Sequence, residues 1–425
     1  MTFETAFTID TSSIKYGPGV TGEVGYEMKR LGARQVVVFT DQPLSKSESV
    51  CIVLKALHSE GIETSLFNGV QIEPTDASFK EAIRFAADGK FDGFVAVGGG
   101  STIDTAKAAN LYSTYPAEFL TYVNQPIGEG RPIPGPLRPL IAIPTTAGTG
   151  SETTGVAVFD LLEMHCKTGI AHRALRPTIA IIDPHNTRTL PKMVAACTGF
   201  DILSHALESL TALPYHQRPA PPNPALRPAY QGSNPISDIW AARAIQMVTE
   251  NIVPAVEESN EEARAQMLLA ACFAGIGFGN AGVHLPHGMS YPVSGMVRDY
   301  IPPDYPIDHP IIPHGMSVIL NAPAVFRFTA PSNPQRHLYA AQLMGVDVRD
   351  ANPKNAGDLL ATAIAKLMRR LSIPNGLSAV GYGEQDIPKL VEGTLPQHRV
   401  TKLSPRPFNE TELRQLFLES MTCWQ

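Results

Sequence analysis

The stretch Val95-Ala96-Val97-Gly98-Gly99-Gly100-Ser101 joins an apolar run to three consecutive glycines, and a helical pattern through Asp104 and Lys107 follows it. A short β-branched run of this kind predicts a buried strand. In a doubly wound sheet, a glycine turn after a strand lets the backbone approach a phosphate, and the following helix amino terminus favours the anion. The stretch therefore predicts a pyrophosphate cradle. It lacks the Gly-x-Gly-x-x-Gly fingerprint, so a purely geometric strand-to-helix turn is an equal alternative.

Further strands and helices are predicted on both sides of this stretch. Buried strands are expected at 36–39, 94–97, 140–143 and 179–182, alternating with helical patterns. Such alternation predicts a parallel sheet covered by helices. Beyond Lys192 the strand signal fades, and long helices are expected around 194–212, 237–253, 261–280 and 355–371. Proline and glycine predict loops at 126–139, 214–235 and 302–313. We predict an α/β domain over residues 1–188 and a helical domain over residues 189–425.

Composition excludes several classes of protein. The 425 residues are 44% hydrophobic and carry a net charge of -6, with no basic block, so nucleic acid is not an expected partner. The apolar stretch 267–279 is shorter than the ~20 residues of a membrane span, so we expect a buried helix and no membrane. The first sixteen residues hold Glu4 and Asp10 against Lys15, unlike a secretory or transit peptide, which predicts a cytoplasmic protein. Five scattered cysteines predict neither disulfides nor a thiolate zinc site.

A second loop, Pro144 to Glu152, again follows a predicted strand and is dense in hydroxyl groups and small residues. Such side chains suit hydrogen bonds to phosphate and ribose, although a tight turn with helix-capping Ser and Thr is the alternative. Asp41 lies just past another strand, where a carboxylate binds ribose hydroxyls and repels a 2′-phosphate. That position favours NAD over NADP. By itself, a residue like Asp41 is more often found in a turn.

The sharpest constellation contains one carboxylate and three histidines. Asp201 and His205 are four residues apart in a predicted helix, so they project from the same face. Downstream, the phrase Pro-His-Gly-Met occurs twice and supplies His287 and His314. This set suits a borderline divalent metal such as Fe(II), with Zn(II) as the alternative, and leaves positions open for a substrate oxygen. Each histidine alone fits a buried structural role, but the repeated phrase beside the helix pair favours a metal site.

Two further histidines, His284 and His309, lie in the same region and compete as ligands or as proton carriers near neutral pH. We rank both below His287 and His314. The chain contains no Gly-x-Ser-x-Gly elbow and no Walker-type Gly-Lys-Ser. Their absence argues against a hydrolase and against a nucleoside triphosphatase.

Taken together, these motifs resemble those of the iron-containing (group III) alcohol dehydrogenase family, through nearly the whole chain. The resemblance implies a Rossmann-like dinucleotide-binding α/β domain, an all-α metal-binding domain of the dehydroquinate synthase-like kind, and an active site in the cleft between them. It implies NAD as cofactor and a homo-oligomer, a dimer or larger. The implied metal ligands are Asp201, His205, His287 and His314. The implied nucleotide-binding residues are Asp41, Gly98, Gly99, Gly100, Ser101, Asp104, Thr145, Thr146, Thr149 and Lys167.

Two departures from the usual family pattern indicate which branch of the family this chain resembles. Many family members carry a further histidine four residues after the first Pro-His-Gly phrase, where this chain has Tyr291. The chain also has a longer loop, Arg298 to Ile312, before the second phrase. With the tail from Gly381-Tyr382 to Leu403, this resembles the hydroxyacid-oxoacid transhydrogenase branch. The branch passes hydride between two acids and implies oxidation of 4-hydroxybutyrate to succinic semialdehyde, coupled to reduction of 2-oxoglutarate to 2-hydroxyglutarate on a retained nicotinamide.

Three residues are candidates for the chemistry of such a reaction. Tyr291, or His284 through a water, is the predicted proton path, although Tyr291 fits equally well as a pocket wall. Arg298 is a candidate for the substrate carboxylate, because guanidinium binds a carboxylate bidentately. A surface arginine is its alternative. The rival functions are a metal-containing, NAD-dependent dehydrogenase of short alcohols or lactaldehyde that releases its cofactor, a non-catalytic nucleotide-binding protein, and a zinc enzyme acting on polyols.

Overall fold

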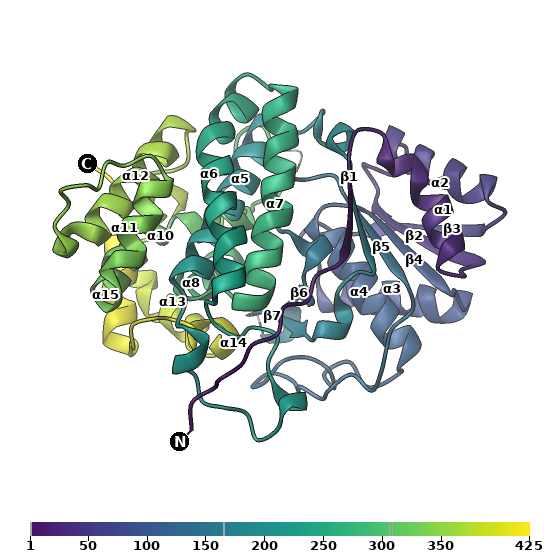
Figure 1. Ribbon diagram of the computed structural model, residues 1–425, viewed down its shortest axis with the longest axis horizontal. Coiled ribbons are helices and arrows are strands. Elements are labelled where there is room, and N and C mark those ends of the chain that lie inside the picture. The colour runs from purple at the N-terminus through teal and green to yellow at the C-terminus, as the bar shows by residue number, and fades with distance from the viewer. Residues whose placement is uncertain (1, 165, 306, 308) are drawn as a thin grey trace. The chain divides into compact units, whose positions relative to one another are not determined.

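The computed structural model describes residues 2–164, 166–305, 307 and 309–425. The chain forms two compact units (Figure 1), one made of Asp10–Thr189 and the other of Leu190–Gln425 together with the residues before Asp10. The sequence interpretation assigned these first residues to the sheet domain. In the structure they join the helical unit, where Glu4 pairs with Arg227 and the Thr8 amide donates to Gln231 at 2.8 Å. An extended segment without periodicity gave no signal for this placement.

The unit Asp10–Thr189 is built on a six-stranded sheet with the order β1-β8-β5-β4-β2-β3, in which all paired strands run parallel. The strands are β1 (Ser13–Tyr16), β2 (Gln35–Asp41), β3 (Glu63–Val70), β4 (Gly93–Gly98), β5 (Leu140–Pro144) and β8 (Ile179–Ile182). Its helices are α1 (Val24–Arg30), α2 (Glu48–Ser59), α3 (Asp76–Gly89) and α4 (Gly100–Thr114). The four strands predicted from the sequence are confirmed.

Alternate residues of the central strands enter two separate cores, because side chains in a strand point alternately to opposite faces. Val36 and Val38 of β2 pack on one face with residues of α1 and α2. Val37 and Phe39 pack on the other face with residues of α3 and α4. Both faces are therefore covered, which explains why the strands are apolar throughout rather than alternating.

The sheet reverses its strand order beside β2. From β2 the chain adds β3 on one side and then returns to add β4 on the other. Ligands of open α/β sheets bind at the carboxyl ends of the strands that flank such a reversal. The residues that follow β2 and β4 therefore occupy the position where this fold binds a ligand.

A two-stranded antiparallel sheet, β6 (Val156–Leu161) with β7 (Cys166–Ala171), belongs to the same unit and was not predicted from the sequence. Its strands mix apolar residues with Asp160 and Lys167, so no clean period marks them.

The second unit is helical, as expected, and α6 and α7 lie side by side in Figure 1. Nearly all residues of α5 are buried, which marks it as a central helix. The stretch 267–279 lies within the largely buried α7, which confirms the predicted buried helix. The long helices are α5 (Lys192–Thr211), α6 (Pro235–Glu257), α7 (Glu261–Ala281), α8 (Leu285–Gly295), α11 (Pro334–Leu343), α12 (Ala356–Arg370) and α15 (Glu410–Ser420). The shorter ones are α9 (His314–Ile319), α10 (Ala322–Thr329), α13 (Ile387–Thr394) and α14 (His398–Thr401).

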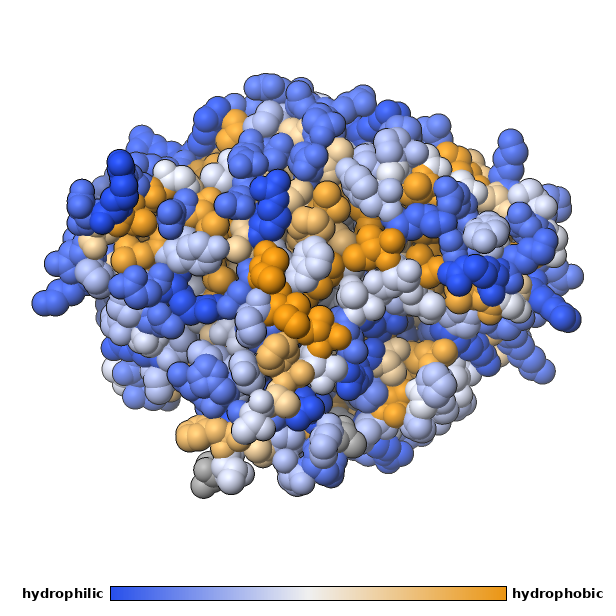
Figure 2. All heavy atoms as spheres, in the orientation of Figure 1, coloured by the Kyte–Doolittle hydropathy of each residue, from blue (hydrophilic) through white to orange (hydrophobic). Residues whose placement is uncertain are grey.

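The face shown in Figure 2 is largely hydrophilic, with hydrophobic side chains in scattered groups. Exposed Ile236 and Ile239 at the start of α6 are examples of such side chains in the chain as a whole. Within the described residues, no single helix is long and apolar enough to cross a membrane. The helices α7 and α8 pass that test only together, across a bend of 106°.

Candidate functional site

The glycine stretch forms the turn from β4 into α4. Gly98 pairs in register with Pro144 of β5, and the Thr145 amide donates to the Gly98 carbonyl at 3.0 Å. This pairing brings together the two loops that the sequence singled out. A side chain on Gly100 would collide with the second loop, because its Cβ would lie 2.6 Å from Thr149.

The amino terminus of α4 has the features of an anion site. Gly99 is its N-cap residue, no side chain caps the helix, and no acidic side chain lies in its first turn. The backbone N–H groups at a helix start carry partial positive charge and attract phosphate. A Cβ on Gly99 would lie 3.2 Å from Thr146, so the hydroxyl-rich loop Pro144 to Glu152 lies close to the start of α4. The arrangement fits a pyrophosphate group.

Asp104 and Lys107 connect α4 to the end of the loop Pro144 to Glu152 and to the strand β6 that follows it. The Lys107 ammonium is fully buried and donates to Ser151 at 2.6 Å and to the Val156 carbonyl at 2.7 Å. Asp104 binds the Ser151 hydroxyl, and it accepts from the Val158 amide at 2.9 Å. Burial lowers the pKa of Lys107. Both oxygens of Asp104 thus bind the chain itself, and we interpret the residue as holding the loop rather than contacting nucleotide.

Two further side chains predicted to bind nucleotide, Asp41 and Lys167, differ in their surroundings. Asp41 ends β2 beside the sheet reversal, and burial raises its pKa while it accepts from the Leu44 amide at 2.8 Å. Lys167 lies on β7, is 3% exposed, and forms ion pairs with Glu73 and Asp160. Burial opposes the charge, but these two carboxylates raise the pKa of Lys167. Its ammonium is therefore held by two carboxylates of the protein.

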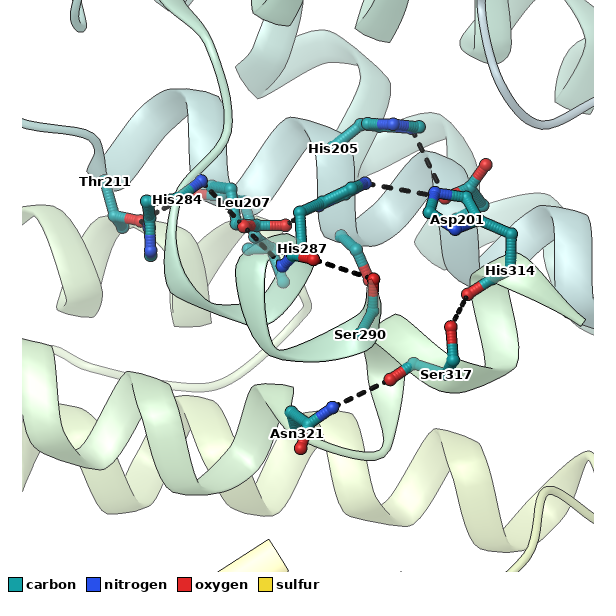
Figure 3. A network of polar contacts seen from close by, with 12 residues as sticks. Asp201, His205, Leu207, Thr211, His284, His287, Ser290, His314, Ser317 and Asn321 are labelled. Carbon is teal, nitrogen blue, oxygen red and sulfur yellow. Dashed lines mark hydrogen bonds and ion pairs between the residues drawn. The ribbon is translucent and has the colours of Figure 1, made fainter. Parts of the chain in front are cut away.

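The predicted metal ligands come together in the helical unit. Asp201 and His205 lie one turn apart on α5, His287 lies in the first turn of α8, and His314 begins α9. One ligand atom from each of the four lies within 4.8 Å of the others. Figure 3 shows the three imidazoles turned toward Asp201, whereas His284 points toward Thr211.

Distances in this cluster fit a shared cation better than direct hydrogen bonds. Asp201 Oδ1 lies 3.6 Å from His205 Nδ1, and 3.8 Å from the Nε2 atoms of His287 and His314. Two ligands of a tetrahedral ion at about 2.1 Å are roughly 3.4 Å apart, close to these values. His205 Nδ1 and His287 Nε2 are buried and form no hydrogen bond with any described residue. Burial, with His287 and His314 nearby, lowers the pKa of His205 well below its usual value, which leaves a neutral imidazole suited to a metal.

Glu208 is a candidate functional residue whose role the sequence interpretation did not assign. Its carboxylate accepts from the backbone amides of His284 at 2.8 Å and His287 at 3.2 Å, and it binds His287 Nδ1. The proton on Nδ1 leaves the Nε2 lone pair directed at the cluster, as in the outer shell of many metal sites. Burial alone would raise the pKa of Glu208, but His287 and these hydrogen bonds lower it. The spacing Asp201, His205, Glu208 on one helical face was the available signal.

The glycine in each Pro-His-Gly phrase has a packing role. A Cβ on Gly315 would lie 2.0 Å from the Cys197 carbonyl oxygen and 2.8 Å from the Asp201 Cβ. A Cβ on Gly288 would lie 2.6 Å from Thr401 of α14. Each phrase therefore places a histidine beside a glycine that lets its helix pack directly on a neighbouring helix.

The predicted proton carriers differ in their access to the cluster. Thr211 donates its own proton to the Leu207 carbonyl at 2.7 Å, so the contact of 3.0 Å between its oxygen and His284 Nε2 requires His284 to donate. His284 is fully buried, and burial lowers its pKa to about 4. Tyr291 lies on α8 one turn after His287, and its hydroxyl accepts from Arg399 at 2.6 Å. The geometry therefore favours Tyr291 over His284.

Arg298 is tied to the surface of the helical unit. Its side chain is 52% exposed and forms an ion pair with Asp386, while a second nitrogen donates to the Gly381 carbonyl at 3.2 Å. The Arg298 guanidinium, predicted as a candidate for binding the substrate carboxylate, is thus already paired with Asp386. These surroundings fit the alternative prediction that Arg298 is a surface arginine. His309 has contacts of its own and is not part of the four-residue cluster.

Comparison with known families agrees with this arrangement. The profile described as "Iron-containing alcohol dehydrogenase" matches residues 11–184, and "Fe-containing alcohol dehydrogenase family, C-terminal" matches residues 229–421. The chain belongs to the iron-containing alcohol dehydrogenase family and is an oxidoreductase.

Several individual proteins within this family are similar to the chain over nearly its whole length. The chain is 55% identical to a protein of Bos taurus named "Hydroxyacid-oxoacid transhydrogenase, mitochondrial", over 99% of this chain and 91% of the relative. Among solved structures, a 1,3-propanediol oxidoreductase matches with a TM-score of 0.85 at 28% identity, over 98% of this chain and 100% of the other. A sulfoacetaldehyde reductase from Bifidobacterium kashiwanohense, in complex with NAD+, matches with a TM-score of 0.79 at 26% identity, over 99% of both chains.

The predicted cytoplasmic location is wrong on this comparison. The bovine relative and those from several other species are named as mitochondrial proteins. The prediction rested on the charges of the first sixteen residues, and in the structure Glu4 among them serves the fold as an ion-pair partner of Arg227. The charges of residues that take part in the fold do not indicate the compartment of a protein, because a targeting signal is a separate segment.

Proposed function

We propose that this chain is a metal-dependent hydroxyacid-oxoacid transhydrogenase that uses NAD. The hydroxy acid is 4-hydroxybutyrate and the oxo acid is 2-oxoglutarate, which yield succinic semialdehyde and 2-hydroxyglutarate. The observation that carries the proposal is the buried cluster of one carboxylate and three imidazoles, in a chain 55% identical along almost its whole length to a relative with that name.

The proposal assigns the metal to Asp201, His205, His287 and His314, with Fe(II) as the metal and Zn(II) as the alternative. Their donor set, burial and mutual distances fit a borderline divalent ion. Such an ion, when bound, supplies Lewis acidity toward an alcohol or carbonyl oxygen. Glu208 holds His287 in the tautomer that this role requires.

The nucleotide is assigned to the ends of β2, β4 and β5. The start of α4 and the loop of Thr145, Thr146 and Thr149 bind the pyrophosphate through backbone amides and hydroxyls. Asp41 binds the adenosine ribose and repels a 2′-phosphate, which selects NAD. The nicotinamide of bound NAD supplies and accepts the hydride.

We assign to Tyr291 the transfer of the hydroxyl proton that the hydroxy acid loses on oxidation. The Tyr291 hydroxyl oxygen accepts a hydrogen bond from Arg399, so its own proton is available to the oxygen of the oxo acid when that acid is reduced, directly or through a water. The phenolate that this donation leaves takes the proton of the hydroxy acid in the other half-reaction. The assembly is proposed to be a homo-oligomer, a dimer or larger, which light scattering after size exclusion tests.

The decisive experiment is an assay of anaerobically purified, iron-loaded protein with both acids and no added NAD. Both products are followed by mass spectrometry. Equal amounts of succinic semialdehyde and 2-hydroxyglutarate are the expected result. Turnover only after addition of NAD, with NADH accumulating, would identify a conventional dehydrogenase with a dissociable cofactor. No turnover in either case, with metal bound, would leave a nucleotide-binding protein without this activity.

A further inference from the structure

Arg399 is a half-buried cation whose neighbours in the described part of the chain are phenols. Its Nη2 donates to the Tyr291 hydroxyl at 2.6 Å. Its guanidinium carbon lies 5.3 Å from the centre of the Tyr230 ring, and Tyr230 is also a hydrogen-bonding neighbour. Its Nη1 is buried and forms no hydrogen bond with any described residue.

This surrounding lacks the partner that a guanidinium in a protein usually has. A buried charge is costly unless an opposite charge or hydrogen bonds compensate it. Phenol rings and hydroxyls satisfy a guanidinium only in part, because it has five N–H donors in a fork that matches a carboxylate. Among the described residues, no Asp or Glu forms an ion pair with Arg399, in contrast to the pair between Arg298 and Asp386.

Two independent contacts place Arg399 beside the metal-binding cluster. The first runs through Tyr291, which lies on α8 four residues after His287 and so shares a face with it. The second runs through Tyr230, whose ring packs on Phe278 with centroids 6.5 Å apart. The Phe278 ring is in turn stacked on His205 at 3.9 Å.

The packing of α14 fixes this placement. Thr401 of α14 lies against Gly288, the residue after His287, where a Cβ would come within 2.6 Å of its methyl group. Tyr230 and Leu403 both pack against Gly282, just before α8. The backbone that carries Arg399 is thus held against the start of the helix that carries His287.

The two proposed substrates share one feature that such a cation would recognise. In 4-hydroxybutyrate, two methylene groups separate the carbon that loses hydride from the carboxylate. In 2-oxoglutarate, two methylene groups separate the carbon that gains hydride from the distal carboxylate. A single cation at a fixed distance from the reacting carbon therefore serves both half-reactions, and three C–C bonds of about 1.5 Å each set that reach.

We propose that Arg399, supported by Tyr291 and Tyr230, forms the subsite that binds the carboxylate common to both substrates. The assignment rests on the proposed function for the identity of the two acids. It replaces Arg298 in that role, because Arg298 is exposed and already paired with Asp386. Arg399 is a binding residue that sets substrate class and the position of the reacting carbon.

The test uses butyrate, which has the carboxylate and chain length of the hydroxy acid but no hydroxyl group. Butyrate binding to the metal-loaded protein is measured by calorimetry for wild type, Arg399→Met, Arg399→Lys, Arg298→Met and Arg243→Met. Arg243 is an exposed arginine of α6 and serves as the matched control. Oxidation of butan-1-ol with added NAD measures catalysis that needs no carboxylate.

Arg399→Met is expected to weaken butyrate binding by about 10- to 100-fold, the range for a lost charge-assisted hydrogen bond. Arg399→Lys keeps the charge without the fork and should fall between Arg399→Met and wild type. Butyrate binding and butan-1-ol oxidation by Arg243→Met should each stay within about threefold of wild type, well below that range. Arg399→Met should lose less catalytic efficiency with butan-1-ol than with 4-hydroxybutyrate, because only the acid uses the carboxylate subsite. KM for both acids should rise in Arg399→Met.

Unchanged butyrate binding in a folded Arg399→Met protein would overturn the proposal, as would an equal loss in Arg298→Met. If Arg399→Met does not fold, Arg399→Gln takes its place, and unchanged binding there has the same meaning. A failure of the proposed function is a separate result. Wild type would then transfer no hydride between the two acids, while butyrate binding would still depend on Arg399.

Discussion

At the level of single residues, Glu208 controls the tautomer of His287. In a Glu208→Gln variant, the side-chain N–H₂ group can only donate hydrogen bonds. If it faces His287 Nδ1, the imidazole proton must move to Nε2. If it faces the backbone amides of His284 and His287, those amides lose their acceptor. The lone pair directed at the metal is lost or misplaced. We expect metal affinity to fall by about 10- to 100-fold.

Competition with a chelator of known affinity measures this loss, and circular dichroism checks the fold. Glu250→Gln, at an exposed position of α6, is the matched control and should bind metal like wild type. Equal metal affinity in both variants would show that the contact between Glu208 and His287 has no part in binding.

The four metal-binding candidates were identifiable from the sequence, but their outer partners were not. Asp201 and His205 share a helical face, and the repeated phrase marked His287 and His314, so residue type and spacing were sufficient signals. Glu208 acts through a hydrogen bond to a residue on another helix, and Arg399 acts from a helix near the carboxyl terminus. Such contacts depend on tertiary packing, and the same lack of packing information made Arg298 look available.

At the level of elements, the contact between α9 and α5 depends on the absence of a side chain. Gly315→Ala would place a methyl group 2.0 Å from the Cys197 carbonyl oxygen, which is backbone and cannot rotate away. Helix α9 must then move, and His314 moves with it. We expect a stability loss of about 1–3 kcal/mol, typical of overpacking, together with weaker metal binding.

Thermal unfolding and metal content check this expectation. Gly22→Ala is the control, because the nearest atom to its added Cβ in the described part of the chain, a side-chain carbon of Ile52, is 4.0 Å away. A Gly315→Ala protein with wild-type metal content and melting temperature would show that α9 has more room than the packing indicates.

Elements were predictable where one period ran long enough. Strands buried on both faces gave continuous apolar runs, and the long helices of the second unit gave the 3.6-residue pattern. The β6 and β7 pair was missed because it is a short hairpin outside the six-stranded sheet and carries charged residues. Short helices such as α9 and α14 span too few turns to show a period.

At the level of the whole molecule, the two proposed ligands bind different units. Removing the metal with a chelator should therefore increase amide exchange in α5, α8 and α9, because ligand binding stabilises only the structure that binds it, by about 2.7 kcal/mol at one hundred times Kd. NADH should instead protect the residues from 98 to 104 and from 145 to 153. Hydrogen exchange with mass spectrometry measures both. Protection of α5 by NADH alone, with none from metal, would contradict the assignment.

The ion pair between Glu4 and Arg227 makes a pH-dependent contribution to the stability of the helical unit. The contact lowers the pKa of Glu4 from 4.5 to about 2. A carboxyl group with a lowered pKa in the folded state stabilises above its unfolded pKa, and the contribution is lost as pH falls through the folded value. Wild type should exceed Glu4→Gln by up to about 1 kcal/mol at pH 7, with a shrinking difference between pH 4.5 and 2.

Urea unfolding of both proteins over this pH range measures the difference. Asp347→Asn, which changes an exposed carboxyl group that pairs with Arg349 only two residues away, is the control for local charge effects. A difference between wild type and Glu4→Gln that stays constant down to pH 3 would contradict the assigned pKa.

The same contact has a consequence for the order of events during synthesis. Glu4 and Arg227 are 223 residues apart, as are Thr8 and Gln231. A ribosome adding about 5–20 residues per second needs on the order of 10–45 s to supply these partners. The sheet unit, whose last strand ends at Ile182, is complete on the ribosome before that moment. The stretch that holds Glu4 and Thr8 is therefore synthesised well before its partners, and until they appear it remains accessible to proteases and to other proteins.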